Sequence, residues 1–448
     1  MKKVLLGTLA VLTLAACSKD EVIQQNPNDE ITFSVVTNKA VSRAFDGYCN
    51  NATPKEMKVS ALYTDGTAPI TWKTYFTNET YKKVDNTDAA EKDYAIPTGS
   101  GLRYWPDLGK ADDGIKMKFF AMVNADPDWD GTTGMTADFI VPSTVSDQKD
   151  VLYAVQEVDV KPDGGAQSIN FRHALSQIEF MAQNQNKNIY VEISGVQVMN
   201  VWDKGTIKFS ASTAGNVGAH ATTTGATYPE NQLCTWTGLA NSTATETKAA
   251  QNFGVKFGAI KLSQKKVTKE TTGESPSITY GEDQAPASSL TTANDEDKEY
   301  SSNTMYLLPQ QIAAWAPTTE DKTPGPGKGS YFLVKAKIWN VAAGDGTRAA
   351  SGDIVLWDNQ KKVSGEGGSE TTVEQFIAIP IPSIKWIAGK RYVYTFIFTT
   401  DGNGGYNPGD GEPVLTPITL SVTVDDFVDG FPYKDGETTI DGTVNMNK

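Results

Sequence analysis

Few side chains in this chain belong to the types that perform nucleophilic or metal-assisted chemistry. The 448 residues include two histidines, His173 and His220, and three cysteines, Cys17, Cys49 and Cys234. A zinc site needs three or four such ligands close together, and a cysteine nucleophile needs a histidine beside it. His173 lies in an apolar strand pattern and His220 in a Gly-Ala loop. We therefore expect neither an enzyme nor a bound metal or cofactor.

Three other segments have compositions that can bind ligands. Residues 401–412 offer Asp, Asn and Glu oxygens to a calcium ion, but their spacing differs from the EF-hand loop and their Asp-Gly and Asn-Gly pairs are typical of turns. Residues 325–330 lack the four-residue gap of a phosphate loop and precede a strand. Asp425 and Asp426 are adjacent, so on a strand they point to opposite faces and make a poor glycosidase pair. The first two segments predict turns, and the third predicts a strand end.

The N-terminal residues give Cys17 a different chemistry. Two lysines precede an apolar run over residues 4–14, which is shorter than the roughly 20 residues needed to cross a bilayer. Small residues, ending in Ala16, then lead directly to Cys17. This arrangement resembles a bacterial lipobox, in which cleavage between Ala16 and Cys17 leaves a cysteine that carries a diacylglycerol. We expect residues 1–16 to be a lipoprotein signal peptide of a Gram-negative outer-membrane protein. An ordinary secretory signal that ends near a cysteine is the alternative.

The charge balance limits the partners of the chain. Its 40 basic and 54 acidic residues give a formal net charge of −14. Nucleic acids and anionic lipid surfaces repel a chain of this charge, so we expect no nucleic-acid partner. The separation of Cys49 and Cys234 in the sequence says nothing about their distance in space, and we expect both to be free or buried thiols.

The pattern of apolar residues favours β-structure throughout. β-branched and aromatic residues recur in short alternating runs, and long stretches with a period of 3.6 residues are missing. This pattern predicts an all-β sandwich architecture. Strands are expected at residues 31–35, 57–63, 94–97, 102–106, 115–123, 151–155, 168–180, 189–193, 196–199, 304–310, 331–339, 375–380, 390–398 and 417–424.

The same pattern divides the chain into parts. Residues 17–43 are expected to form a polar tether and a first strand, residues 44–185 an N-terminal β-sandwich, and residues 186–448 a C-terminal β-sandwich. Polar residues 183–188 mark the boundary between the two sandwiches. Residues 210–300 are rich in Thr, Ser, Ala, Asn and Gly, so we expect long loops or an insertion there.

Several short motifs follow one another in the order of a known family. They are Tyr104-Trp105-Pro106, Met117–Ala121, Asp150–Ala154, Phe171–Ser176, Gly389–Tyr394 and Val422–Phe427. With the lipobox, they make the chain similar to the fimbrillin superfamily, the two-domain lipoproteins that supply subunits of type V pili. The resemblance implies an all-β fold with two tandem transthyretin-like β-sandwich domains. Residues 210–300 match none of its motifs, and Phe427 stands where the family usually has tryptophan.

The resemblance also implies a maturation step. A trypsin-like protease would cut between Arg43 and Ala44 and release the first strand, in which Ile31, Phe33 and Val35 form the leaving apolar face. The open groove would expose unpaired backbone groups, which attract another strand. The terminal strand of another subunit would then fill it, as in donor-strand complementation.

The donor strand has two candidates. The strand that contains Ile418, Leu420, Val422 and Val424 has the cleanest alternation in the chain, but the same pattern suits a permanent core strand. In that case the tail over residues 430–448 would be the donor. Two further alternatives stay open: an accessory or tip subunit that never donates, and an Arg43 that is an ordinary linker arginine.

The expected function is therefore that of a structural and adhesive subunit of a surface pilus, or fimbria. Its partners would be other pilin subunits, a trypsin-like protease, the outer membrane through the lipid of the precursor, and a host or bacterial surface receptor. The alternative is a lipid-anchored, monomeric glycan-binding protein, because exposed indoles stack on sugar rings. The tryptophans near polar turns that suggest it are Trp72, Trp129, Trp202 and Trp357.

Overall fold

The structure is a computed structural model in which nearly all regular structure is β-sheet. The short 3₁₀ turn η3 (Val145–Asp147) is the helical element among the described residues, and none of their helices has the length and hydropathy that a membrane crossing needs. The prediction of an all-β fold is confirmed. The structure describes residues 30–35, 55–64, 71–84, 94–97, 100–106, 116–130, 134–158, 166–169, 171–209, 234–241, 253–270, 277–290, 304–318, 320–342, 346–348, 351–365, 368–400, 404–426 and 443–444.

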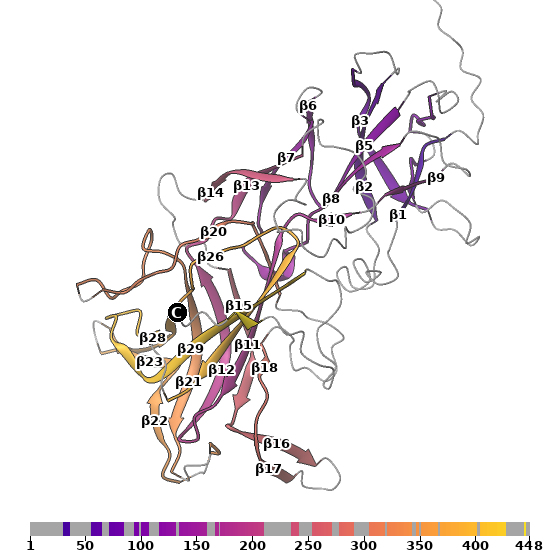
Figure 1. Ribbon diagram of the computed structural model, residues 1–448. Coiled ribbons are helices and arrows are strands. Elements are labelled where there is room, and N and C mark those ends of the chain that lie inside the picture. Colours follow the sequence, from indigo (N-terminus) through magenta and orange to yellow (C-terminus); the bar gives the residue numbers. More distant parts are fainter. Residues whose placement is uncertain are drawn as a thin grey trace, which may run out of the picture.

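An eight-stranded sheet forms the N-terminal module (Figure 1). Its strands alternate apolar and polar residues, and the apolar side chains of seven of them meet in one core, so the sheet curls around its own interior. In the order in which they are hydrogen-bonded, its strands are β10 (Arg172–His173), β8 (Leu152–Val158), β5 (Lys116–Val123), β2 (Glu56–Thr64), β3 (Lys73–Lys83), β4 (Tyr94–Ala95), β1 (Thr32–Val35) and β9 (Ala166–Ile169).

A twelve-stranded sheet forms the C-terminal module. Its main path is β15 (Phe253–Leu262), β12 (Ile189–Met199), β21 (Tyr331–Asn340), β25 (Ile377–Pro380), β28 (Gly404–Tyr406), β29 (Pro413–Asp426), β27 (Lys390–Phe398), β11 (Ser176–Asn184) and β18 (Ser288–Ser289). Three short strands pair with members of this path: β19 (Met305–Leu307) with β11, β22 (Ile354–Trp357) with β21, and β30 (Thr443–Val444) with β29.

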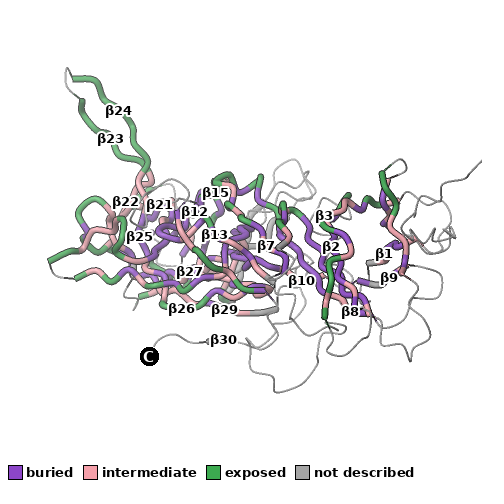
Figure 2. The backbone as a smooth tube through the Cα atoms, turned by 90° about the horizontal axis from the view of Figure 1, so that it is seen from above, coloured by how far each residue is buried: buried purple, intermediate pink, exposed green. Residues whose placement is uncertain are grey.

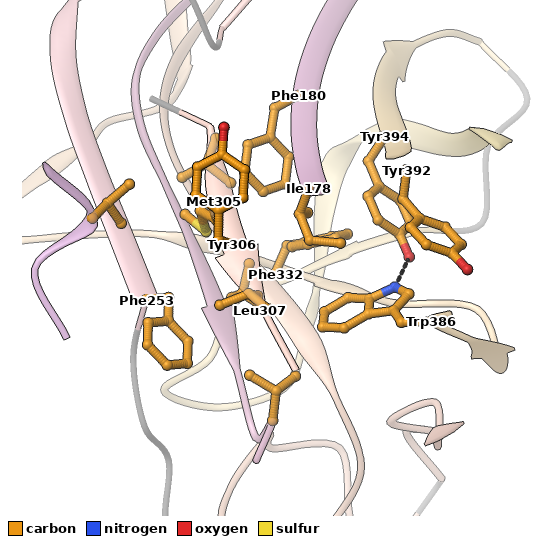
Figure 3. Close-up of a cluster of buried hydrophobic side chains, with 14 of the residues drawn as sticks. Ile178, Phe180, Phe253, Met305, Tyr306, Leu307, Phe332, Trp386, Tyr392 and Tyr394 are labelled. Atoms are coloured by element: carbon orange, nitrogen blue, oxygen red, sulfur yellow. Dashed lines mark hydrogen bonds between the residues drawn. The ribbon is translucent and has the colours of Figure 1, made fainter. Parts of the chain in front are cut away.

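Aromatic side chains fill the core of the C-terminal module (Figure 3). The ring of Phe332 lies 4.9 Å from that of Tyr394, and the rings of Phe180 and Phe396 stack with centroids 6.1 Å apart. The indole N–H of Trp386 donates a 2.9 Å hydrogen bond to the hydroxyl of Tyr394. Because both polar groups are buried, this bond removes the cost of leaving them without partners.

A four-stranded sheet joins the two modules. It takes β6 (Asp128–Asp130) and β7 (Gly134–Ile140) from the segment between β5 and β8, and β13 (Lys204–Phe209) and β14 (Thr235–Ala240) from the segment between β12 and β15. Strand β5 is buried on both faces. Phe119 and Ala121 face the N-terminal core, whereas Phe120 and Met122 belong to the large core shared with the four-stranded sheet and the C-terminal module. Apolar contacts are therefore continuous from one module to the other.

Three two-stranded sheets complete the described structure. Strands β23 and β24 form an exposed hairpin that projects from the body of the molecule (Figure 2). The pairs are β16 (Lys265–Glu270) with β17 (Ser277–Gln284), β20 (Gln311–Ile312) with β26 (Ile384–Lys385), and β23 (Gln360–Ser364) with β24 (Glu370–Glu374).

The run over residues 168–180, predicted as one strand, is divided among three strands. Strands β9 and β10 belong to the N-terminal module and β11 to the C-terminal module. The change of module therefore falls between His173 and Ser176, before the expected boundary at residue 185. The apolar positions change from odd (Ile169, Phe171) to even (Ile178, Phe180) across this point. A period of two records which residues are buried and carries no information about which sheet buries them.

Residues 210–300, where we expected long loops or an insertion, contain the strands β14 to β18 among their described residues. The longest of these strands covers residues 253–262. These residues form β15, which pairs with β12 and buries Phe253, Ile260 and Leu262 in the large core. Gly254 of β15 allows close pairing with β12, because a Cβ atom there would lie 3.0 Å from Cγ of Gln197. A Cβ atom on Gly195 of β12 would lie 3.0 Å from the carbonyl oxygen of Val255, beside the irregular register of this pair.

Candidate functional site: the groove around the first strand

The expected first strand is present as β1 and lies inside the N-terminal sheet (Figure 1). On one edge it runs parallel to β9, with four residue pairs from Thr32 opposite Ala166 to Val35 opposite Ile169. On the other edge it is antiparallel to β4, with Phe33 opposite Tyr94. The N–H of Ile31, just before β1, donates a 2.8 Å hydrogen bond to the carbonyl oxygen of Arg103. Both edges of β1 are thus paired with neighbouring segments of the chain.

The alternating apolar residues of β1 point into the core of the N-terminal module. Ile31 and Phe33 are fully buried. The ring of Phe33 meets those of Tyr81 and Phe119 edge to face, at centroid distances of 4.8 and 5.2 Å. Burial of each of these two side chains contributes about 1.5–3 kcal/mol. Loss of β1 would therefore leave two apolar pockets as well as unpaired backbone groups.

Polar side chains surround these pockets. The guanidinium of Arg103 forms an ion pair with the Glu79 carboxylate, and the hydroxyl of Tyr75 donates a 2.6 Å hydrogen bond to the carbonyl oxygen of Tyr104. Burial, helped by the nearby Glu79 charge, raises the pKa of the Tyr81 phenol well above its usual value. The phenol stays neutral at physiological pH, which suits its position in an apolar core.

Strand β9 depends on β1 more than β1 depends on β9. Within the described residues, β9 forms its ladder with β1 alone. Outside this ladder, β9 contacts β8 and buries the side chains of Gln167 and Ile169. Ordering the backbone of four residues costs about 1–2 kcal/mol per residue, whereas burial of the Ile169 side chain returns about 1.5–3 kcal/mol. Burial of the Ile169 side chain by itself therefore does not offset the conformational entropy lost when β9 is ordered.

The candidate donor residues lie in β29, an interior strand of the C-terminal sheet. Ile418 and Val422 are buried, and Leu420 and Val424 are half-buried against the large core. One edge of β29 pairs with β27 through nine residue pairs, and the other edge pairs with β28. This placement favours the permanent core strand among the two alternatives and leaves the tail as the candidate donor. Within the tail, β30 pairs with β29 opposite Val422 and Thr423.

The residues of the two expected processing steps lie outside the described part of the chain. They are Ala16 and Cys17 at the signal cleavage and lipidation site, and Arg43 and Ala44 at the proteolytic site. Lipidation and cleavage after Arg43 therefore stay predictions. Cys49 and His220 are also outside the described residues.

The remaining histidine and cysteine have structural surroundings. Nδ1 of His173 contacts the carboxylate of Asp150, which joins β10 to the segment before β8. Cys234 is a free and buried thiol, and burial raises its pKa to about 11. Among the described residues, no group of three or more His, Cys, Asp and Glu side chains is placed to hold a metal ion.

The acidic glycine-rich segment uses its oxygens within a turn. Oδ1 of Asn407 accepts a 3.0 Å hydrogen bond from the N–H of Gly409, and Oδ1 of Asp410 accepts one of 3.0 Å from the N–H of Glu412. These bonds are those of a tight turn. They occupy oxygens that a calcium ion would need.

The four tryptophans considered for glycan stacking are half-buried. The ammonium group of Lys118 lies 4.7 Å from the ring centroid of Trp72, and the ring of Trp129 lies 5.3 Å from that of Phe120. Trp357 packs against the large core. Their rings serve mainly to pack against the protein, and Trp202 is likewise only partly accessible.

Sequence reasoning did not find the walls of the groove around β1. Tyr94, Phe119 and Ile169 all lie in or beside runs predicted as strands, so their burial was foreseeable from alternation. Nothing in that alternation places them next to residues 31–35, because strand order in a sheet is a long-range property. The contact between Asp150 and His173 was missed for the same reason.

Comparison with solved structures gives matches of low sequence identity. A candidate cell adhesion protein from Bacteroides uniformis is 12% identical, with a TM-score of 0.36, and the match covers 89% of this chain and 99% of that one. One from Parabacteroides distasonis is 12% identical, with a TM-score of 0.34 and coverage of 84% and 95%. A structure named for candidate polysaccharide binding proteins of Bacteroides thetaiotaomicron is 12% identical, with a TM-score of 0.29 and coverage of 91% and 99%.

Comparison with protein families gives a match over most of the chain. No curated protein matches the sequence. The family model described as fimbrillin-like matches residues 42–426, which include every strand of both modules except β1 and β30. The chain therefore belongs to the fimbrillin-like family.

Proposed function

We propose that this protein is a structural and adhesive subunit of a surface pilus, exported as a lipoprotein, cleaved by a trypsin-like protease and polymerised by strand exchange. Its family supports a surface protein of the adhesion type. The observation that carries the finer proposal is the placement of β1. This apolar strand is buried between β4 and β9, and residues 36–55, which include Arg43, separate it from β2 in the sequence.

Cleavage after Arg43 would convert β1 into a separate peptide. Its departure would then expose the edge of β4 and the pockets of Ile31 and Phe33. An exposed strand edge pairs readily with another chain. A strand from a second subunit would supply main-chain hydrogen bonds, and its alternating side chains would set the register. The energy of the joint would thus come from interactions that already stabilise the precursor.

In this proposal Cys17 carries the lipid that delivers the precursor to the outer membrane. Removal of residues 17–43 then takes away the anchor together with β1. The tail after β29 is the candidate donor, because β29 itself has a partner on each edge. The work of the protein is structural, with other pilin subunits and a surface receptor as partners and with no catalytic step of its own.

The N-terminus of the surface-exposed protein tests this proposal. We expect the wild-type protein to start at Ala44 and to migrate as an SDS-resistant ladder. The Arg43→Gln variant should keep residues 17–43 and remain a monomer, because a trypsin-like protease requires a basic residue. The control is Lys39→Gln, which removes a basic residue from the same linker and should be processed normally.

The opposite result would be a wild-type surface protein that starts at acylated Cys17, retains residues 18–43 and stays monomeric. Polymerisation by loss of β1 would then be wrong. Binding of that monomer to a polysaccharide would instead support the glycan-binding alternative.

A further inference from the structure

The two neighbours of β1 differ in what holds them. Strand β4 pairs with β3 as well as with β1, with Ala95 opposite Lys82 and Tyr94 opposite Lys83. Strand β9, by contrast, forms its ladder with β1 alone among the described residues. It lies at the edge of the sheet and has four residues, so β1 is its link to the rest of the ladder. The two walls of the groove are therefore unequal.

From this asymmetry we infer that only one side of the groove, strand β4, stays in the sheet when β1 leaves. When β1 leaves, β9 leaves its place in the sheet as well, and β4 remains. The incoming strand then pairs with β4 first and rebuilds β9 on its free edge. The functional role of this release of β9 rests on the proposed strand exchange, but the dependence of β9 on β1 is a property of the intact chain.

The release of β9 has a defined limit at its C-terminal side. Strand β10 begins shortly after β9 and pairs with β8, with Arg172 opposite Tyr153 and His173 opposite Leu152. The N–H of Ala174 donates a 2.8 Å hydrogen bond to the carbonyl oxygen of Val151, and His173 contacts Asp150. None of these contacts involves β1. Opening should therefore stop before Arg172 and leave the joint between the modules intact.

The rebuilt wall sets requirements for the partner, which is an extended strand of a second pilin chain. To restore both ladders, this strand must run antiparallel to β4 and parallel to β9. It must also place apolar side chains, two residues apart, in the pockets of Ile31 and Phe33. A strand in the reverse direction or shifted by one residue would lose β9, the pockets or both. Folding of β9 on binding would thus add to specificity.

Hydrogen exchange of the intact, uncleaved chain tests the dependence directly. We expect Phe33→Ala to raise exchange at least tenfold at the amides of β1 and β9 together, because Phe33 anchors β1 in the core. Amides of β5 and residues 172–174 should keep their wild-type rates. If Phe33→Ala fails to fold, Ile31→Val is the milder variant, with a smaller rise expected in the same two strands.

The matched control is Phe76→Ala, which removes a buried aromatic ring of the same core from β3. It should raise exchange in β2 and β3 without a selective effect on β9. Faster exchange in β1 with unchanged protection in β9 would overturn the inference. This result is independent of whether Arg43 is cleaved, so it separates failure of the inference from failure of the proposed function.

A second measurement uses the chain after its linker has been cut and β1 has been removed. Residues 166–169 should then exchange freely, and a synthetic peptide of residues 30–35 should restore their protection. A peptide with the same composition in scrambled order should not do so. Full protection of β9 in the absence of β1 would again contradict the inference.

Discussion

Two strands in different modules carry almost the same five residues. Residues 31–35 read Ile-Thr-Phe-Ser-Val, and residues 418–422 read Ile-Thr-Leu-Ser-Val. Both lie inside a sheet, and both bury the first isoleucine. Yet β1 has four residues and lies beside the weakly held edge strand β9. By contrast, β29 has 14 residues, and nine residue pairs join it to just one of its neighbours, β27. The residues of the two segments are nearly the same, so they do not explain how firmly each strand is held. The length of the strand and the pairing of its neighbours explain it.

The physical basis of this difference is cooperative. Removal of β29 would break its nine residue pairs with β27 and its pairing with β28, and it would open the large core. Removal of β1 would open two pockets and release one short strand. The N-terminal module can lose β1 and β9 and keep the strands from β10 to β4 paired to one another. Of these two strands, β1 is therefore the one whose removal breaks fewer interactions.

The largest effect is expected for a charge in the core beneath β29. Val422→Asp places a carboxylate in the buried core and should lower the free energy of unfolding by about 4 kcal/mol or more, enough to reduce soluble expression. Ser421→Asp, on the opposite and half-buried face of the same strand, is the control and should be far milder. Chemical denaturation measures both. Equal losses in the two variants would mean that Val422 is no more deeply buried than Ser421 and that β29 is not held in the core as described.

The next prediction compares Ile31 and Ile418, the first residues of the two similar five-residue segments. Ile31→Ala and Ile418→Ala each remove a buried side chain and should cost about 2–5 kcal/mol locally. For Ile418→Ala this loss should appear in the midpoint of global unfolding. For Ile31→Ala it should appear as local opening of β1, with little change in the midpoint of the C-terminal module. Urea titration with hydrogen exchange distinguishes the two cases, and equal shifts of the global midpoint would remove the contrast between the strands.

The smallest effect concerns Cys234, at the start of β14 in the joint between the modules. Because burial raises the pKa of its thiol to about 11, alkylation at pH 8 should be slow in the native state and fast after unfolding. The folded pKa lies above the unfolded one, so this thiol's contribution to stability is full below about pH 9 and declines between about pH 9 and 11. A Cys17→Ser/Cys49→Ser background isolates this thiol. Rapid alkylation once β1 is removed would show that β1 also supports the joint.

Much of the local structure could be predicted from the sequence. Alternation predicted strands close to the observed β2, β12, β21, β27 and β29, because a half-buried strand must alternate apolar and polar residues. The nearly continuous apolar run of β5 predicted a central strand. Alternation failed at residues 168–180, which we predicted as one strand although the alternation changes phase at Ala174 and Leu175, and which form three strands in two sheets. Composition failed at β15, whose glycines permit close approach to β12. Strand order and the dependence of β9 on β1 lie beyond local patterns, since both arise from residues distant in the sequence.

The sequence by itself determined the all-β class, the apolar face of the first strand and the family, because each depends on residue types and their local spacing. The tertiary structure decided which apolar strand is bound strongly and which weakly. Residues 31–35 and 418–422 are nearly identical, so the decision rests on the neighbours: one short edge strand for β1, and two ladders within a large core for β29. Cooperative pairing between distant segments is the physical reason, since each strand is only as stable as the sheet that continues beyond it.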